Sequence, residues 1–470
     1  MENKRQQQNF GNKWVIAGIL LVGTFIAFLN ETSLTTALPS IIKELHLTDT
    51  SGQWLTTAFM LTSGIMVPMS AFLIKRFSTR SLFFISMGLF TIGTILGSMS
   101  PNFSTLIIAR IIQAMGAGIL LPFMQTVFFF IFPEEERGMA MGIMGIVISF
   151  APAVGPTFAG WLIQHYRWQD LFYTSIPIAI LDLIFGYFYL KNVKESEKAK
   201  LDLLSLVTSA IGFGTFLYGF SNAGEYGWTS SKFFVPVIIG VISLIIFAYR
   251  QLTMENPFLD LRVFKSPTFS FATLIILIVF AGFLSTEVIL PLYVQSARGY
   301  TAFRSGLLLL PGALILAVMS PITGRLFDKF GGRILILTGL LLVTIGTFSF
   351  MFLTATTSLT FISTMYAIRL FGISLFMMPL MTLSLNALEK RSYSHGIAAT
   401  TTLRQVAASI GTAILVTIMT DGAKNSGIAN PMKAMIHGMN LSFATAAGIT
   451  LLAFIIAFFV VKDNKKQAKN

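Results

Sequence analysis

The chain has 470 residues, of which 54% are hydrophobic and 11% are charged. A soluble domain carries about 25% charged residues, so this composition excludes a chain whose whole surface faces water and indicates a membrane protein. The sequence contains no cysteine, which excludes disulfides and thiolate metal sites. It has four histidines and no hydrolase or zinc-protease motif. We therefore expect neither an enzyme, nor a metal site, nor a bound cofactor.

The apolar segments are long enough to cross a membrane many times. A spanning helix needs about 20 mostly apolar residues, because its backbone must satisfy its own hydrogen bonds in hydrocarbon. The first segment is too long for a signal peptide and lacks a cleavage site, so we expect it to be a retained helix. The sequence predicts fourteen spans, at 14–38, 53–74, 81–99, 104–131, 138–163, 168–190, 203–221, 233–250, 268–296, 302–325, 333–354, 359–386, 395–420 and 438–461.

The basic residues predict the orientation of these spans. The formal net charge is +13, but the lysines and arginines lie in short loops, which fits membrane topology and anionic lipid headgroups better than nucleic-acid binding. With a cytoplasmic N-terminus, 23 of the 33 basic residues lie inside and 7 outside, and 3 lie within spans. Cytoplasmic loops carry the excess of Lys and Arg. We therefore expect a multi-pass protein with both termini in the cytoplasm.

Two charged stretches divide the predicted spans into groups. The stretches 191–202 and 250–265 bracket spans 7 and 8. This organisation predicts an all-α membrane protein with two six-helix bundles, at 1–190 and 268–470, and a linker with an extra helix pair at 191–267. Related bundles are common in secondary transporters. No nucleotide-binding glycine loop is present, so we expect a proton gradient rather than ATP to supply the energy.

Two kinds of motif recur in corresponding places of the two bundles. The loop after span 10 contains glycines for a tight turn and a mixture of acid and bases that could form a charge lock at the cytoplasmic end. It reads Gly324-Arg-Leu-Phe-Asp328-Lys-Phe-Gly331-Gly-Arg333, and the loop after span 2, 71–80, is a weakened copy. An arginine also recurs in the fourth helix of each bundle, as Arg110 and Arg369.

Span 5 combines small residues with prolines. Glycines let two helices approach closely, and prolines bend a helix. The residues are Gly142, Gly145, Pro152, Gly155, Pro156 and Gly160. A bent, tightly packed helix between two bundles could seal one side of a cavity. The alternative is a helix that is packed and has no such role.

At these motifs the chain resembles the major facilitator superfamily, and more narrowly its fourteen-helix drug:proton antiporters (the QacA, EmrB and LmrB type). The segments 167–177 and 256–264 resemble two further elements of that family. The resemblance covers essentially the whole chain. It implies a monomeric carrier in the bacterial cytoplasmic membrane, whose partners are small-molecule drugs, protons and membrane lipids. One departure is Asn30, where the family usually has an aspartate.

Glu31 is the first candidate for proton coupling and for binding a cationic drug. Ionisable side chains inside hydrocarbon are costly and are functional candidates by default. Glu31 stands one residue after the family's acidic position, which turns it about 100° around the helix. Desolvation disfavours a charged carboxylate, so we expect Glu31 to take and release protons near neutral pH. A glutamate at the outer interface is the alternative. We expect Arg110 to be its partner, with a structural role on backbone carbonyls as the alternative.

Other charged residues within the spans are further candidates. Glu287 lies in the first helix of the second bundle, loosely mirrors Glu31, and could bind a proton or a cation. Asp182 lies in span 6, where packing or snorkelling is the alternative to coupling. Arg404 and Gln405 in span 13 are weaker candidates, because their direction does not follow from the sequence.

These features predict proton-coupled efflux of hydrophobic, often cationic drugs by alternating access. An exporter of a narrower cargo, such as a tetracycline, a lipid or a siderophore-like metabolite, keeps the same fold and stays open. A membrane sensor without transport activity is the second alternative. The charged residues within the spans and the intact loop 324–333 argue against it.

Overall fold

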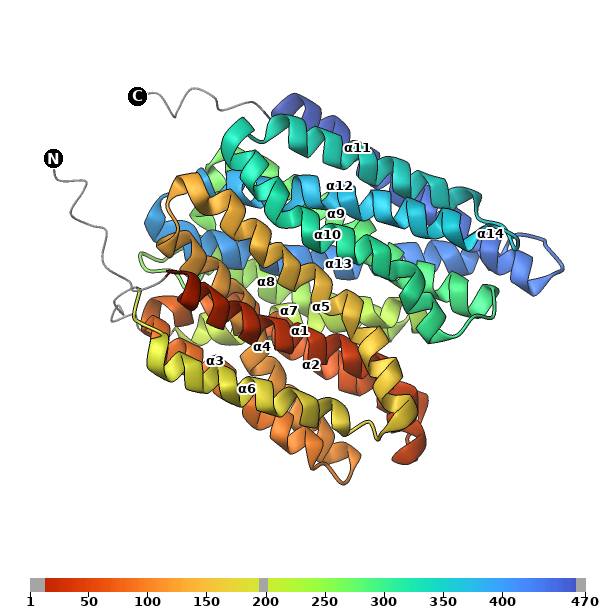
Figure 1. The fold of residues 1–470 in the computed structure, drawn as a ribbon, viewed down its shortest axis with the longest axis horizontal. Coiled ribbons are helices and arrows are strands. Elements are labelled where there is room, and N and C mark those ends of the chain that lie inside the picture. The colour runs from red at the N-terminus through yellow and green to blue at the C-terminus, as the bar shows by residue number, and fades with distance from the viewer. Residues whose placement is uncertain (1–12, 194–201, 462–470) are drawn as a thin grey trace.

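The computed structural model describes residues 13–193 and 202–461. Its long helices follow one another along the chain (Figure 1). They are α1 (Lys13–Glu44), α2 (Asp49–Arg76), α3 (Thr79–Ser98), α4 (Phe103–Ile131), α5 (Arg137–His165), α6 (Asp170–Tyr189), α7 (Leu203–Tyr226), α8 (Ser231–Thr253), α9 (Pro267–Leu292), α10 (Ala302–Phe330), α11 (Arg333–Ser349), α12 (Leu359–Asn386), α13 (Tyr393–Lys424) and α14 (Pro431–Val460). Short helical turns lie between some of them, at Glu134–Glu136, Leu261–Lys265, Tyr293–Ala297, Phe350–Phe352 and Lys390–Ser392.

The prediction of fourteen spans is confirmed. Within the described residues, fourteen helices are long and apolar enough to cross a membrane. Several extend beyond the apolar segment that predicted them: α1 continues through Pro39 to Glu44, and α2 already begins at Asp49. The difference arises because hydropathy marks only the part of a helix that lies in hydrocarbon, whereas the helix itself continues into the polar interface.

Polar side chains fix where the helices begin. Asn102 accepts a hydrogen bond from the Thr105 amide at 3.0 Å, and Asn430 accepts one from the Lys433 amide at 3.1 Å. Such caps satisfy backbone amides that have no partner inside the helix. At the end of α10, Gly331 adopts a φ of 86°, a conformation that suits glycine and stops the helix.

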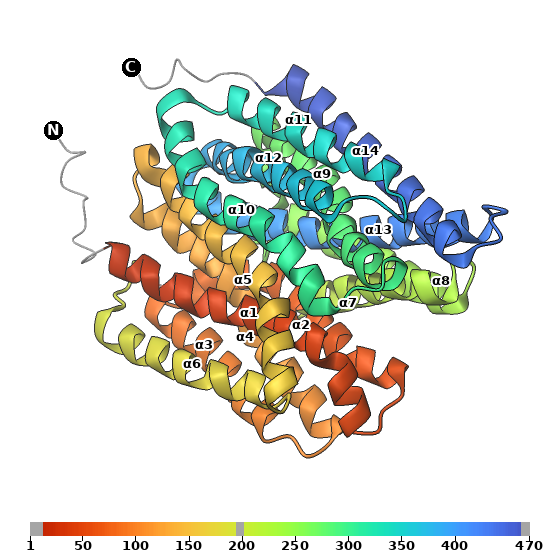
Figure 2. The same cartoon turned by 45° about the vertical axis from the view of Figure 1, so that its right-hand side comes forward.

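The helices pack in two groups of six. Helices α1–α6 pack on one another, and so do α9–α14 (Figures 1 and 2). The groups meet along α5 and α10, which lie side by side in both views, and along α2 and α13. Small residues allow the closest approaches inside each group. A Cβ at Gly116 of α4 would clash with the Ser86 carbonyl of α3, and a Cβ at Gly372 of α12 would lie 2.6 Å from the Gly339 carbonyl of α11.

Helices α7 and α8 pack on each other, and α7 packs against both α2 and α13, where the two groups meet. Tyr218 of α7 stacks on Trp54 of α2, with 5.6 Å between the ring centroids. Just after α7, the Trp228 indole donates a 2.9 Å hydrogen bond to the Thr417 hydroxyl of α13. The helix pair therefore contacts both groups of six.

Candidate functional site: charged clusters within the spans

Arg110 of α4 lies at the centre of a buried polar cluster in the first group of helices. Its side chain is 1% exposed. The Nη1 atom donates hydrogen bonds to Gln113 at 2.5 Å and to Asn30 of α1 at 3.3 Å. The Nε atom donates to the Leu55 carbonyl of α2 at 3.4 Å. The guanidinium also lies over the Phe59 ring, 4.0 Å from its centroid. Arg110 thus binds α1 and α2 through neutral groups.

The cluster extends to two further helices. The Gln113 side chain donates a 2.8 Å hydrogen bond to the Thr94 hydroxyl of α3, and the Asn30 amide donates a 3.3 Å bond to the Ser175 hydroxyl of α6. All four residues are at least 97% buried. Buried polar networks of this kind hold helices in one register when every member is satisfied.

Glu31 has no direct partner in this cluster. Its side chain is half-buried in the middle of α1. Within the described part of the chain, its carboxylate makes no hydrogen bond or ion pair, although Arg110 is near enough for the two charges to interact. The expected pairing with Arg110 is therefore electrostatic only, because Asn30 takes the hydrogen bond. This follows from the one-residue displacement of the acid, which places it on a different face of the helix.

The second group of helices contains a corresponding arginine with an acidic partner. Arg369 of α12 is 1% exposed and donates from Nη1 to Glu287 of α9 at 3.0 Å. The Tyr366 hydroxyl donates a 2.7 Å hydrogen bond to the other carboxylate oxygen of Glu287. Arg369 also binds the Thr347 hydroxyl of α11 at 3.2 Å and the Phe283 carbonyl at 3.3 Å. Here the fourth helix of the group is bound to the first by a closed ion pair.

Asp182 lies away from both arginines, where α6 packs on α1 and α3. Its side chain is 3% exposed, so the snorkelling alternative is wrong. The Oδ2 atom has no hydrogen-bond partner among the described residues. A Cβ at Gly23 of α1 would lie 2.7 Å from that oxygen and 3.3 Å from the Met87 sulfur of α3. The glycine thus makes room for a buried carboxyl group that forms no ion pair in the described part of the chain.

The loop motif after α10 joins the two groups of helices at one end of the bundle, the end where α1 begins and α14 ends, which we name the terminal side. Asp328 accepts hydrogen bonds from the backbone amides of Gly138 and Met139, both at 2.9 Å. These amides are at the start of α5, where the helix dipole favours a negative charge. The acid therefore binds the start of α5 in the other group of helices, rather than the bases of its own loop.

The remaining residues of this loop have local roles. Gly324 packs directly on Gly138. Arg333 donates a 3.4 Å hydrogen bond to the Phe458 carbonyl of α14. A second contact between the groups lies nearby, where Arg137 of α5 donates a 2.8 Å hydrogen bond to Asn386 of α12.

The glycine motif of α5 faces both groups of helices. Gly142 packs on the Ser320 backbone of α10, across the boundary between the groups. Gly155 packs on Thr32 of α1, and its carbonyl accepts a 3.4 Å hydrogen bond from Ser33. Gly160 has open space around it. The motif also includes Pro152 and Pro156, which both lie inside α5.

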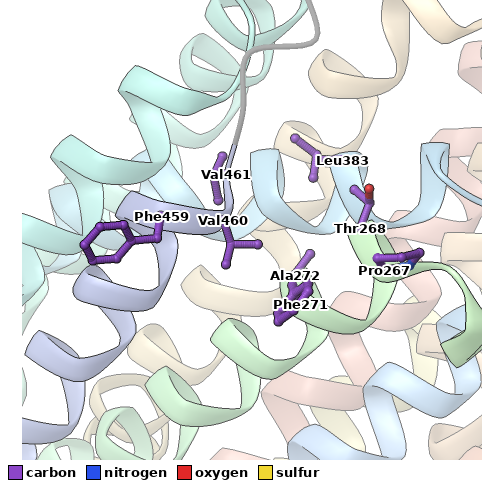
Figure 3. Close-up of a pocket in the computed structure, with 8 residues that line it drawn as sticks. All are labelled: Pro267, Thr268, Phe271, Ala272, Leu383, Phe459, Val460 and Val461. Carbon is purple, nitrogen blue, oxygen red and sulfur yellow. The ribbon is translucent and has the colours of Figure 1, made fainter.

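Two cavities lie on the terminal side, apart from the charged clusters. The first, of about 380 Å³, is apolar and lies between the start of α9 and the ends of α12 and α14 (Figure 3). Pro267, Leu383 and Val460 are among its lining residues. The second, of about 680 Å³, has a charged lining that includes Lys75 and Glu389. Neither cavity is lined by Glu31, Glu287 or Asp182.

Part of the second cluster was not predicted from the sequence. Arg369 stands in the fourth helix of its group as Arg110 does, but its pairing with Glu287 and the contribution of Tyr366 came only from the structure. The spacing of two of these residues could have indicated the cluster. Tyr366 and Arg369 are three residues apart and therefore share a helix face.

Comparisons with known proteins agree with this architecture. The family model of the Major Facilitator Superfamily matches residues 20–412. An uncharacterised transporter of the same superfamily from Bacillus subtilis, YcnB, is 48% identical over 99% of this chain and 98% of its own length. Lincomycin resistance protein LmrB of the same organism is 42% identical over 95% of each chain.

A solved structure shares the fold at low sequence identity. The human organic anion transporter MFSD10 superposes with a TM-score of 0.70, covering 95% of this chain and all of that one at 12% identity. Identity this low shows the fold alone. Taken with the family match and the fourteen spanning helices, it leads to one assignment: the chain belongs to the Major Facilitator Superfamily of membrane transporters.

Proposed function

We propose that this protein exports hydrophobic, often cationic drugs across the bacterial cytoplasmic membrane in exchange for protons. The similarity to a lincomycin resistance protein along 95% of the chain supports drug export. The charged residues within the spans support coupling to protons, because such residues are costly in a membrane and mark ion or proton pathways.

The contrast between the two arginine clusters is the observation that carries this proposal. In the second group, Glu287 is held by Arg369 and Tyr366. In the first group, Arg110 is held by neutral side chains, and Glu31 makes no hydrogen bond with any residue that the structure describes. A carboxylate with no fixed partner can exchange a proton for a cationic drug at little structural cost. We therefore assign the exchange to Glu31 and treat Glu287 and Asp182 as further proton sites.

We propose that the two groups of six helices alternate between two orientations around these clusters. The terminal side is taken as cytoplasmic, and Asp328 bound to the start of α5 holds it closed. A drug would enter when this contact opens. Protons arriving from outside would then return the carrier to its starting state. The drug and the proton would bind Glu31 one after the other. This alternation links the export of the drug to the return of the carrier.

Ethidium efflux from energised cells tests the proposal. We compare the wild type with Glu31→Gln, which keeps the shape of the side chain and removes its charge. Glu389→Gln makes the same change at an exposed surface residue and is the matched control. The proposal predicts efflux that a protonophore abolishes, that Glu31→Gln loses and that Glu389→Gln keeps. Efflux that survives in Glu31→Gln would move the coupling to Glu287 or Asp182. No efflux from the wild type would favour a narrower cargo.

A further inference from the structure

Arg404 of α13 is a charged residue within a span that the proposed coupling does not use. It lies eleven residues after the start of α13, which places it about 16 Å along the helix from the terminal side. Its guanidinium lies over the Phe280 ring of α9, 4.7 Å from the centroid. No described residue forms a hydrogen bond or an ion pair with it. A guanidinium has five N–H donors, so this one is short of acceptors.

The neighbouring helices provide no acid to neutralise Arg404. Helices α2, α4, α7, α9 and α14 pack against α13. In their described residues the sequence has one acid away from a helix end, Glu287, and Arg369 already binds it. The other two, Asp49 and Glu225, stand at the ends of α2 and α7. Within the described ranges 13–193 and 202–461, Arg404 is thus a positive charge in a membrane span that no acid compensates, and such a charge is costly to retain without a function.

An unsatisfied hydroxyl group on the same helix indicates a polar ligand near Arg404. Thr401 precedes Arg404 by three residues, so helical spacing places it next to Arg404 on the same side of α13. Its hydroxyl has no hydrogen-bond partner among the described residues, although Thr401 is only 6% exposed. Threonine in a helix ordinarily binds the carbonyl four residues back, as Thr417 of the same helix does with Ala413 at 2.8 Å.

We propose that Arg404 and Phe280 form an anion-binding subsite for the transported molecule. The ligand class is a hydrophobic molecule with a carboxylate or a similar anionic group. The anion would bind the guanidinium and the Thr401 hydroxyl, and the ring of Phe280 would hold the guanidinium in place. Arg369 and Glu287 neutralise each other. The positive charge of Arg404 would therefore be balanced by the anionic group of the ligand. The inference rests on the proposed function, because it names a class of cargo for the same carrier.

Binding to the purified full-length protein in lipid nanodiscs tests this proposal. The anionic probe is radiolabelled nalidixate, a hydrophobic monocarboxylate, and the cationic probe is ethidium. The variants are Arg404→Gln, which removes the charge, and Arg404→Lys, which keeps it. Arg304→Gln is the matched control, because it makes the same change at an exposed arginine near the start of α10.

The proposal predicts that Arg404→Gln raises the Kd for nalidixate about tenfold or more, as expected for the loss of a charge-assisted hydrogen bond. Arg404→Lys should show a smaller rise and Arg304→Gln none. The Kd for ethidium should change less than about twofold in all three variants. This result would also show that the variants are folded. Equal nalidixate affinity in Arg404→Gln and the wild type, or no nalidixate binding by the wild type, would overturn the proposal. Failure of drug export in cells would instead appear as absent ethidium efflux, so the two failures are distinguishable.

Discussion

Replacing Asp328 by asparagine should open the terminal side of the protein. The carboxylate accepts two amide hydrogen bonds of 2.9 Å across the boundary between α10 and α5. An asparagine keeps one oxygen acceptor, but it loses the other and the charge. A hydrogen bond to a charged group contributes about 1.5–3 kcal/mol, and a charge at a helix N-terminus about 0.3–1 kcal/mol. We expect the substitution to destabilise the closed arrangement by about 2 kcal/mol relative to the open one. This corresponds to roughly a 30-fold fall in the ratio of closed to open molecules.

Distance measurements between spin labels can detect this change directly. The chain has no cysteine, so labels can be attached at chosen positions without background. Glu135 and Lys329 are exposed beside the contact, one on each group of helices, and both are replaced by cysteine. Pulsed electron paramagnetic resonance spectroscopy should show one short distance between the two labels in the protein that keeps Asp328. In Asp328→Asn it should show an additional, longer distance. Glu389→Gln serves as the control on the same side. An unchanged distance distribution in Asp328→Asn would refute the reasoning.

Three further predictions concern other parts of the structure. Glu287→Gln should lower the free energy of unfolding by about 3–5 kcal/mol, because it leaves Arg369 buried without its acid. In a thermal unfolding assay, the double variant with Arg369→Gln should recover part of this loss. Gly142→Ala should reduce both folded yield and transport, because its Cβ would clash with the backbone of α10; normal ethidium efflux in this variant would contradict the assigned packing. Arg250 holds the pKa of Asp202 at about 2, below its ordinary 3.8, so the stability that this pair contributes is present above about pH 4 and is lost as the pH falls towards 2. Asp202→Asn should remove that part of the pH dependence in acid unfolding.

The number and order of the spans followed from the sequence because hydropathy and the distribution of basic residues are strong signals in a membrane protein. Helix α1 shows the limit of those signals: its apolar segment ended near residue 38, but the helix continues to Glu44. The repeated arginines also identified the centres of both clusters, since a charge within a span stands out against its apolar surroundings.

The partners of these charges could not be predicted in the same way. In a membrane, residues that face lipid and residues that face other helices are both apolar, so hydrophobic periodicity does not mark the inward face. The direction of Arg404 was therefore open until Phe280 was found beneath it. The sequence placed Asn30 and the adjacent Glu31 on different sides of α1, but it did not show which of the two binds Arg110, and the structure assigns that hydrogen bond to Asn30.

The most direct test of the central claim is whether drug binding releases protons from Glu31. Ethidium is added to purified protein in a weakly buffered solution near neutral pH, and a pH-sensitive dye records the protons that appear. If the drug displaces a proton from this carboxyl group, the wild type should release protons in proportion to the bound ethidium, and Glu31→Gln should release almost none. Equal proton release from both proteins would contradict the assignment of coupling to Glu31.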